Sequence, residues 1–478
     1  MYQKKDADQL EFENFYLPFS GKLNKENRWV KLAAMIPWCE IEERYMELFS
    51  PDQGAPAKPL RMALGALIIK ERCGYTDEET VEQIRENPYL QYFIGMSEYR
   101  DEAPFEASMM VHYRKRLSAD RMREINDMIT GVKRESKSSD GNDSNDDDTK
   151  PGNQGKLIVD ATCTPSDIRY PNDMSLLNEG REKTERIIDV LCEERSEKKP
   201  RTYRKVARKD FIRFIHLKKP DRKKVRKAIG KQLRYVNRNL KNIEKMSGSL
   251  DALSKKEYRD LLVVQELYRQ QKAMYDAQIH HAQSRIVSIS QPHVRPIVRG
   301  KAGASVEFGA KIELALVDGY AFIDHLSWEN FNESSSLKAQ IEQYRTRYGR
   351  YPASVHADKI FRTRDNRKFC KENGIQLSGL PLGRPRLMSK EEKRQIAEDG
   401  RIRNAIEGKF GQGKRRFGLS RIMAKLQETS ECVIWLNIIV MNLERRLAIL
   451  LLSILRQLHC IIRPYIGYFY RPLGVAGD

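Results

Sequence analysis

Three charged side chains near residue 400 have a spacing that could bind a metal ion or phosphate groups. Arg403, Glu407 and Lys414 lie at positions i, i+4 and i+11, which on a helix places them within roughly 40° of one another. A carboxylate between two cations can bind a metal ion while the arginine and the lysine hold phosphates. Taken alone, the pattern is more typical of a surface helix with one ion pair.

Two aspartates upstream each follow a short apolar run that predicts a buried strand. Asp160 follows residues 157–159, and Asp358 follows residues 353–357. Either aspartate alone is explained as the end of a strand. If the two strands are neighbours in a mixed sheet, however, both carboxylates reach one rim, with the helix of Glu407 above them.

Three carboxylates at one rim repel one another unless cations lie between them. Hard oxygen ligands favour Mg²⁺ or Mn²⁺. Two such ions about 3.5–4 Å apart could activate a water molecule or a 3′-hydroxyl and stabilise the leaving oxygen of a phosphodiester. The three residues together therefore predict a site for metal-dependent phosphodiester chemistry.

The elements that must position these residues are a set of strands followed by helices and further strands. Residues 311–317 and 320–326 are joined by Asp318-Gly319, a strong hairpin signal. A helix is predicted at 335–348, a strand at 376–380, and mostly helix over 389–422. This order predicts an α+β fold with a ribonuclease-H-like mixed-sheet catalytic core.

The flanking parts differ in composition. Residues 1–135 predict a helical domain, with a helix–turn–helix outline around Gly74 that fits DNA binding but also many helical bundles. Residues 136–155 are polar and acidic, which predicts a disordered linker between two separate cores. The catalytic domain is then expected at 156–430, followed by a helical segment and tail at 431–478.

A strongly basic block interrupts the catalytic domain. Residues 198–245 hold 20 Lys or Arg against 3 acids, so this block carries +17 of the chain's net charge of +20. Apolar residues that alternate in steps of 4 and 3 predict a coiled-coil seam. We expect a basic helical hairpin inserted at about 191–290 that holds a nucleic acid, with a solvated spacer as the alternative. The predicted DNA contacts are Arg222, Lys223, Lys224, Arg226 and Lys227.

The remaining composition excludes several classes of protein. Seven dispersed cysteines without a CxxC pair favour reduced thiols and argue against a disulfide framework or a zinc finger. The N-terminus is polar and predicts no signal peptide. The apolar run 432–455 is broken at 444–446, and we interpret it as two buried helical segments, each too short to span a bilayer. A glycine-rich nucleotide-binding loop is also absent from the sequence.

The motifs resemble those of insertion-sequence transposases of the DDE class, in the IS-four/IS-five-like superfamily. The resemblance covers nearly the whole chain, through PLRMALGALIIKE, ETVEQIRENPYLQYFIG, IVDAT, VEFGAKI, LVDGYAFIDHLSW, HADKIF and RNAIEGKFGQGKRR. It implies that Asp160, Asp358 and Glu407 are the metal-binding triad. Arg403 and Lys414 match the arginine and lysine of the family's Y-R-E-K signature. Gly400 replaces the signature's tyrosine, so that residue's phosphate contact is missing or supplied elsewhere.

This resemblance implies a DNA transposase that binds terminal inverted repeats and cuts and rejoins strands by hydrolysis and transesterification. We expect Mg²⁺ or Mn²⁺ as cofactor with two ions per site, double-stranded DNA as partner, and a homodimer or higher multimer. We expect no membrane, no nucleotide cofactor, and a cytoplasmic, nucleoid-associated location. The alternatives are a metal-dependent nuclease without strand transfer, or a catalytically decayed DNA-binding protein.

Overall fold

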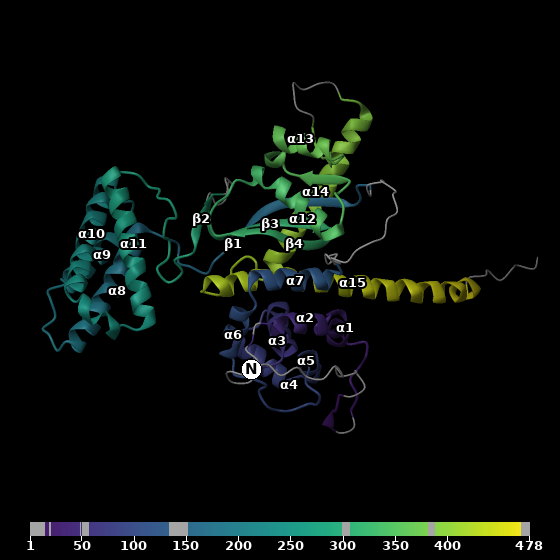
Figure 1. Ribbon diagram of the computed structural model, residues 1–478, viewed down its shortest axis with the longest axis horizontal. Coiled ribbons are helices and arrows are strands. Elements are labelled where there is room, and N and C mark those ends of the chain that lie inside the picture. Colours follow the sequence, from purple (N-terminus) through teal and green to yellow (C-terminus); the bar gives the residue numbers. More distant parts are fainter. Residues whose placement is uncertain are drawn as a thin grey trace, which may run out of the picture.

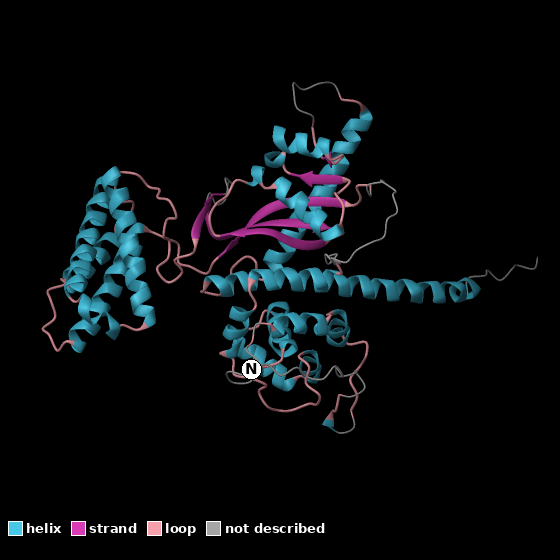
Figure 2. Ribbon diagram, viewed as in Figure 1, coloured by secondary structure: helices cyan, strands magenta, loops and turns pink. Residues whose placement is uncertain are grey.

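The computed structural model describes residues 15–18, 21–47, 49, 57–132, 152–298, 306–380 and 388–469. The described chain has a helical N-terminal region, a twisted sheet with helices on both faces, and a bundle of long helices beside the sheet (Figure 1). Strands gather in the middle of the molecule and helices surround them (Figure 2). The fold is thus mixed α+β, as predicted. The predicted linker at 136–155 and the end of the predicted tail lie largely outside the described residues.

The N-terminal region contains the predicted helix–turn–helix outline. Gly74 ends α3 in the left-handed conformation with φ of 73°, as helix C-termini favour. The Thr76 side chain then caps α4 by accepting a hydrogen bond from the N–H of Glu79. The described helices of this region are α1 (Arg28–Met35), α2 (Trp38–Met46), α3 (Leu60–Cys73), α4 (Asp77–Glu86), α5 (Pro88–Phe93), α6 (Met109–Arg116) and α7 (Ala119–Thr130).

The sheet is mixed, and its described strands follow the order β2-β3-β1-β5-β6, with β4 also paired to β3. β1 (Lys156–Pro165) runs antiparallel to β3 (Val306–Val317) and parallel to β5 (Ser354–Ala357). β5 in turn runs parallel to β6 (Gln376–Leu377). The prediction that the strand of Asp160 lies beside the strand that leads to Asp358 is confirmed.

The predicted hairpin is also present. β3 and β4 (Tyr320–Ser327) are joined by Asp318 and Gly319, whose φ values of 50° and 79° are both positive, as tight hairpin turns require. β3 begins earlier than predicted and there pairs with β2 (Arg295–Val298), a strand that sequence analysis missed. Its Pro296 weakens the strand signal, and the proline is tolerated because β2 lies at the edge of the sheet.

Helices cover both faces of the sheet. On one face, α12 (Leu337–Tyr348) and α13 (Arg364–Glu372) pack on side chains that include Val159 of β1. On the other face, α14 (Lys390–Arg416) and α15 (Gln427–Phe469) pack on a cluster that includes Ile158. Since successive strand residues point to opposite faces, β1 contributes to both apolar layers.

The C-terminal apolar run forms one continuous helix, α15, so the prediction of two separate segments is wrong. The second predicted segment is also not buried, since Ile449, Leu451 and Leu452 are exposed. The charged residues that interrupt the run have partners in the folded chain. Glu444 pairs with Arg72 of α3 at 2.6 Å, and Arg446 donates a hydrogen bond to the carbonyl oxygen of Met35 at 2.9 Å. Because these charges are paired, the helix can pass through the core without a break.

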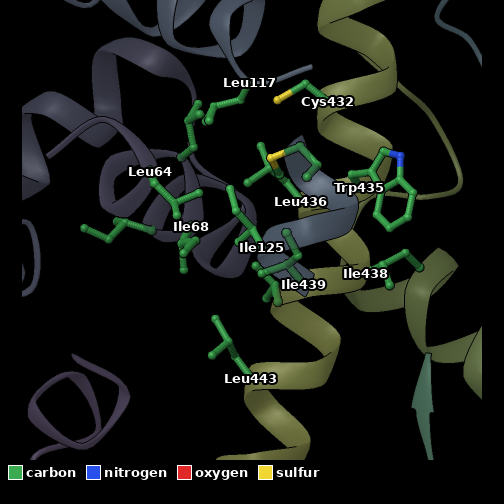
Figure 3. Close-up of a cluster of buried hydrophobic side chains, with 14 of the residues drawn as sticks. Leu64, Ile68, Leu117, Ile125, Cys432, Trp435, Leu436, Ile438, Ile439 and Leu443 are labelled. Atoms are coloured by element: carbon green, nitrogen blue, oxygen red, sulfur yellow. The ribbon is translucent and has the colours of Figure 1, made fainter. Parts of the chain in front are cut away.

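α15 lies between the N-terminal helices and the sheet (Figure 1). One apolar cluster extends from the N-terminal helices through α15 to the sheet. Figure 3 shows part of this cluster, with Leu64, Ile68, Leu117 and Ile125 from the N-terminal region and Cys432, Trp435, Leu436, Ile438, Ile439 and Leu443 from α15. The sequence predicts separate cores on the two sides of the linker, but the structure has one shared core, because α15 supplies the apolar face that the N-terminal helices bury.

The insertion between β1 and β2 is larger than the predicted hairpin. α10 and α11 form that hairpin, and α8 and α9 complete a bundle beside the sheet (Figure 1). α8 packs on both hairpin helices through apolar side chains such as Leu177 and Ile188, so the bundle has its own core. The bounds are α8 (Asp173–Glu194), α9 (Arg204–Ile215), α10 (Arg222–Lys245), the turn η3 (Ser247–Ala252) and α11 (Lys255–Ala277).

Candidate active site

Asp160 and Asp358 lie at neighbouring positions of two parallel strands. Val159 of β1 pairs with Ala357 of β5, so Asp160, the next residue of β1, lies beside Asp358, which follows the end of β5. The prediction that Asp160 ends its strand is wrong, because β1 continues to Pro165 along its pairing with β3. Each carboxylate accepts a hydrogen bond from the N–H of the residue that follows it, at 2.8 and 2.7 Å respectively. For Asp358 this bond caps the short turn η5 (Lys359–Phe361). The local backbone thus holds both carboxylates at the rim.

Glu407 reaches this rim on α14. The helix lies against β1 and β5, and Ile406, which is fully buried, anchors it on the apolar layer below. Two turns earlier, Oδ1 of Asp399 lies 3.6 Å from Nδ1 of His356 on β5, and both side chains are nearly buried. These contacts fix the position of α14 on β1 and β5, and therefore the position of Glu407.

One cavity of about 880 Å³ contains the predicted site. Its lining includes Asp160, Asp358, Glu407, Arg403 and Lys414. Gly400, which stands where the family signature has tyrosine, is not among the lining residues. A side-chain Cβ at Gly400 would meet no described heavy atom within 4 Å, so there is open space beside Gly400.

The cavity disfavours the negative charge of Asp160. Burial raises the pKa of Asp160 to about 6, and the charges of Glu333 and Asp358 add to the rise, while the N–H of Ala161 and the Arg403 guanidinium oppose it. A bound cation would relieve the electrostatic repulsion between Asp160 and the neighbouring carboxylates.

The donor set suits a divalent metal ion in its chemistry, because carboxylate oxygens are the preferred ligands of Mg²⁺ and Mn²⁺. Within the described residues, no three His, Cys, Asp or Glu side chains are arranged closely enough to hold an ion. Glu407 is engaged elsewhere: its Oε1 lies 3.0 Å from Nη2 of Arg403, and its side chain is 55% exposed. An ion at this rim therefore requires the exposed Glu407 side chain to turn away from Arg403.

Two further charged residues line the cavity, Glu333 and Lys311, which were not among the residues predicted from the sequence. Glu333 begins the turn η4 (Glu333–Ser335) between β4 and α12, and Lys311 lies on β3. Nζ of Lys311 is 2.7 Å from Oε1 of Glu333. A signal was present in the sequence, because Asn332 and the serines after Glu333 mark a turn at the start of a predicted helix.

Comparison with known proteins matches two separate parts of the chain. A family model described as a transposase DDE domain matches residues 355–444, which contain Asp358, Arg403, Glu407 and Lys414. A second, described as a transposase domain (DUF772), matches residues 18–116 in the N-terminal region. The chain belongs to the DDE transposases. As in other members of this family, a divalent metal ion is the expected cofactor.

The transposase also resembles a curated protein from Rhizobium meliloti, "Uncharacterized protein ORF8 in nfe locus". The two are 31% identical over 154 residues, which cover 32% of this chain and 69% of the relative. No solved structure matches the transposase significantly. In the described ranges, every helix is too short or too polar to cross a bilayer.

Of the basic residues predicted to contact DNA, Arg403 and Lys414 line the cavity, whereas those of the insertion lie away from it, in the first turns of α10. Arg222, Lys223, Lys224 and Lys227 are exposed there. Arg226 is less exposed than these residues and has a partner on α11. Its guanidinium donates a hydrogen bond to the backbone carbonyl oxygen of Tyr275 at 2.8 Å and lies 4.2 Å from the centre of the Tyr275 ring. In this structure Arg226 therefore joins α10 to α11 as well as adding positive charge.

Proposed function

We propose that this transposase binds the terminal inverted repeats of an insertion sequence and catalyses metal-dependent strand cleavage and strand transfer. The observation that supports the proposal is the single cavity lined by Asp160, Asp358 and Glu407 together with Arg403 and Lys414. Carboxylates suit divalent ions and the two cations suit phosphates, so the cavity has the chemistry of a site for a phosphodiester and its metal ions.

Each residue has a distinct role in the proposal. Asp160, Asp358 and Glu407 hold Mg²⁺ or Mn²⁺, with two ions at full occupancy. When bound, such ions activate the attacking oxygen and stabilise the leaving oxygen of the phosphodiester. The ion pair between Arg403 and Glu407 is 3.0 Å long, so a Glu407 that turns to a metal ion releases Arg403 to a phosphate. Lys414 contributes a second, compact positive charge at the same wall.

The fold supports the same function. The antiparallel β4–β3–β1 and parallel β1–β5–β6 pairings fit a ribonuclease-H-like core, and the Arg403, Glu407 and Lys414 spacing favours the IS-four/IS-five-like superfamily. We propose that the domain at 1–135 recognises the element's ends, and that the insertion holds the DNA backbone through residues such as Lys223. We further propose a homodimer or higher multimer that acts on the nucleoid in the cytoplasm.

A cleavage assay on DNA that carries the element's ends tests this function. The full-length protein is incubated with Mg²⁺ and an end duplex or a scrambled duplex, and the strands are separated on a denaturing gel. With the end duplex we expect nicks at the ends and strand-transfer products, and with the scrambled duplex we expect neither. Cuts without joined products would favour a nuclease, and sequence-specific binding without cuts would indicate a decayed enzyme.

A further inference from the structure

The cavity contains a fourth carboxylate, Glu333, in a turn that is tied to the turn of Asp358. The buried side chain of Asn366 joins the two turns, with 3% of its surface exposed. Its Nδ2 donates to the carbonyl oxygen of Ser334 in η4 at 2.8 Å and to that of Phe361 in η5 at 2.7 Å. One amide therefore fixes the backbone of Glu333 relative to the backbone of Asp358.

A lysine neutralises Glu333 in the cavity wall. Nζ of Lys311 is 2.7 Å from Glu333 Oε1, and the two side chains are only 10% and 21% exposed. The same ammonium donates to the carbonyl oxygen of Phe331 at 2.8 Å and lies 4.5 Å from the centre of its ring. Three contacts hold the lysine, so Glu333 already has a cation as partner.

Glu333 also shares the cavity with the predicted metal ligands. Its side chain lines the same cavity as Asp160 and Asp358. A purely structural ion pair between Lys311 and Glu333 accounts for their mutual contact. The pair gives no reason for a further carboxylate to line the cavity that contains Asp160, Asp358 and Glu407, where another like charge is unfavourable without a cation.

We propose that Glu333 is a fourth ligand of the divalent ion in this cavity, and that the ion displaces the ammonium of Lys311 when it binds. This inference rests on the proposed metal-dependent function and adds one ligand to its site. Four carboxylates bind a divalent ion more tightly than three, and the displaced lysine then becomes a free positive charge at the wall where a phosphate would lie.

Titration of the full-length protein with Mn²⁺, followed by the electron paramagnetic resonance signal of the free ion, measures this ligand without requiring activity. Glu333→Gln keeps the shape of the side chain and should weaken Mn²⁺ binding by about tenfold or more. Glu329→Gln is the matched control, because Glu329 is 56% exposed and pairs with Arg295 outside the cavity lining. It should leave the affinity unchanged.

Lys311→Met provides an independent second measurement with the opposite sign. Removal of the competing ammonium should tighten Mn²⁺ binding in the wild-type background. In the Glu333→Gln background the same change should alter affinity by less than about twofold, because the group for which the lysine competes is gone. An equal increase of Mn²⁺ affinity in both backgrounds would show that Lys311 acts only as a distant charge. That result would overturn the proposal that the ion displaces Lys311 from Glu333.

Asp160→Asn separates failure of this inference from failure of the proposed function. If Asp160→Asn abolishes Mn²⁺ binding while Glu333→Gln matches the wild type, the metal site stands and Glu333 is not one of its ligands. If Asp160→Asn also binds Mn²⁺ as the wild type does, the proposed metal site itself is wrong. Circular dichroism of each variant shows that the protein is folded before its affinity is read.

Discussion

At the scale of single residues, the ionised form of Asp160 is one that a bound cation would stabilise. Burial and the charges of Glu333 and Asp358 raise its pKa from the ordinary 3.8 to about 6, so the charged form is disfavoured in the folded protein. Between these two values the folded chain keeps a proton that the unfolded chain has already lost. The stability contributed by this group therefore falls as pH rises, and the cost is complete above about pH 6.

This sign gives a testable pH dependence for Asp160→Asn, which cannot ionise. In a chelating buffer the variant should be more stable than the wild type above about pH 6, and the difference should shrink toward pH 4 as both states become protonated. Thermal melts of both proteins across this range measure the difference. A gap that stays constant with pH would mean that Asp160 has its ordinary pKa in the folded chain.

Alanine substitutions at the three carboxylates test their role as a unit. Asp160→Ala, Asp358→Ala and Glu407→Ala should each abolish cleavage and leave DNA binding nearly intact, because each removes a metal ligand and not a contact to the duplex. A double variant should be hardly worse than a single one. Gel-based cleavage and binding assays on the same DNA check both statements.

The two cations of the cavity provide the contrast. Arg403→Ala and Lys414→Ala should weaken binding of the element's ends and leave partial cleavage, since we propose that these side chains contact phosphate and not metal. Full cleavage by Glu407→Ala would show that its pair with Arg403 is an ordinary surface contact.

At the scale of elements, the position of α14 depends on a close approach at Gly413. A Cβ on Gly413 would lie 2.6 Å from Cδ1 of Leu419 and 3.2 Å from Sδ of Met441. Because Met441 belongs to α15, the absence of a side chain lets α14 approach α15 closely. This packing outweighs the poor helix propensity of the three glycines that follow Glu407.

Gly413→Ala should therefore displace α14 and destabilise the protein by about 1–3 kcal/mol, with loss of cleavage because Glu407 moves with the helix. Gly400→Ala on the same helix is the matched control. Its Cβ meets open space, so it should stabilise the protein by up to about 1 kcal/mol and preserve cleavage. Chemical denaturation and the cleavage assay measure both; equal effects of the two substitutions would contradict the packing argument.

The basic helix α10 of the inserted helical bundle predicts how DNA affinity depends on salt concentration. Reversal of the charges at Arg222, Lys223, Lys224 and Lys227 should weaken binding to any DNA sequence. It should also flatten the dependence of log K on log salt, since each lost phosphate contact removes about 0.9 from the slope. Arg226 is best left intact, because its bond to Tyr275 holds the hairpin together.

The control for this experiment reverses Lys255 and Lys256 at the start of α11. Both are exposed, and the antiparallel hairpin places them at the opposite end from the start of α10. Fluorescence anisotropy at several salt concentrations gives the slopes. An unchanged slope for the α10 variant, with a folded protein, would reassign the bundle to a spacer or to another partner.

At the scale of the whole molecule, α15 joins parts of the chain that the linker separates. Asn442 of α15 accepts a hydrogen bond from the N–H of Ala321 in β4 at 2.8 Å and donates to Oδ1 of Asn126 in α7 at 2.8 Å. Both asparagines are fully buried. The N-terminal region, the sheet and α15 thus share hydrogen bonds as well as an apolar core, and we expect the N-terminal region and the sheet to move together.

A chain that begins after the N-terminal helices should consequently fail to fold as a soluble unit. The deletion would expose the apolar face of α15, including Leu436 and Ile439, which are fully buried in the intact chain. We expect aggregation, or binding of a dye specific for apolar surface, in size-exclusion and fluorescence measurements. A monomeric, cooperatively melting fragment would show that the catalytic part has a sufficient core of its own.

The sequence by itself determined the elements and residues whose causes are local. Strands around Asp160 and before Asp358, the Asp318-Gly319 turn and the i, i+4 pair of Arg403 and Glu407 follow from periodicity, turn chemistry and helical spacing, which act within a few residues. The parallel pairing of β1 with β5 could be anticipated because few mixed-sheet orders accommodate those strands.

Only the tertiary structure decided which distant groups share one cavity or one core. Glu333 and Lys311 form an ion pair in the cavity because β3 and η4 lie close together in the fold. Nothing in the local sequence of either residue indicates this contact. Likewise Glu444 breaks an apolar run in the sequence but lies 2.6 Å from Arg72 in the fold, which allows one long helix. Burial and charge compensation depend on contacts between residues that are not neighbours in the sequence, and local patterns carry no information about such contacts.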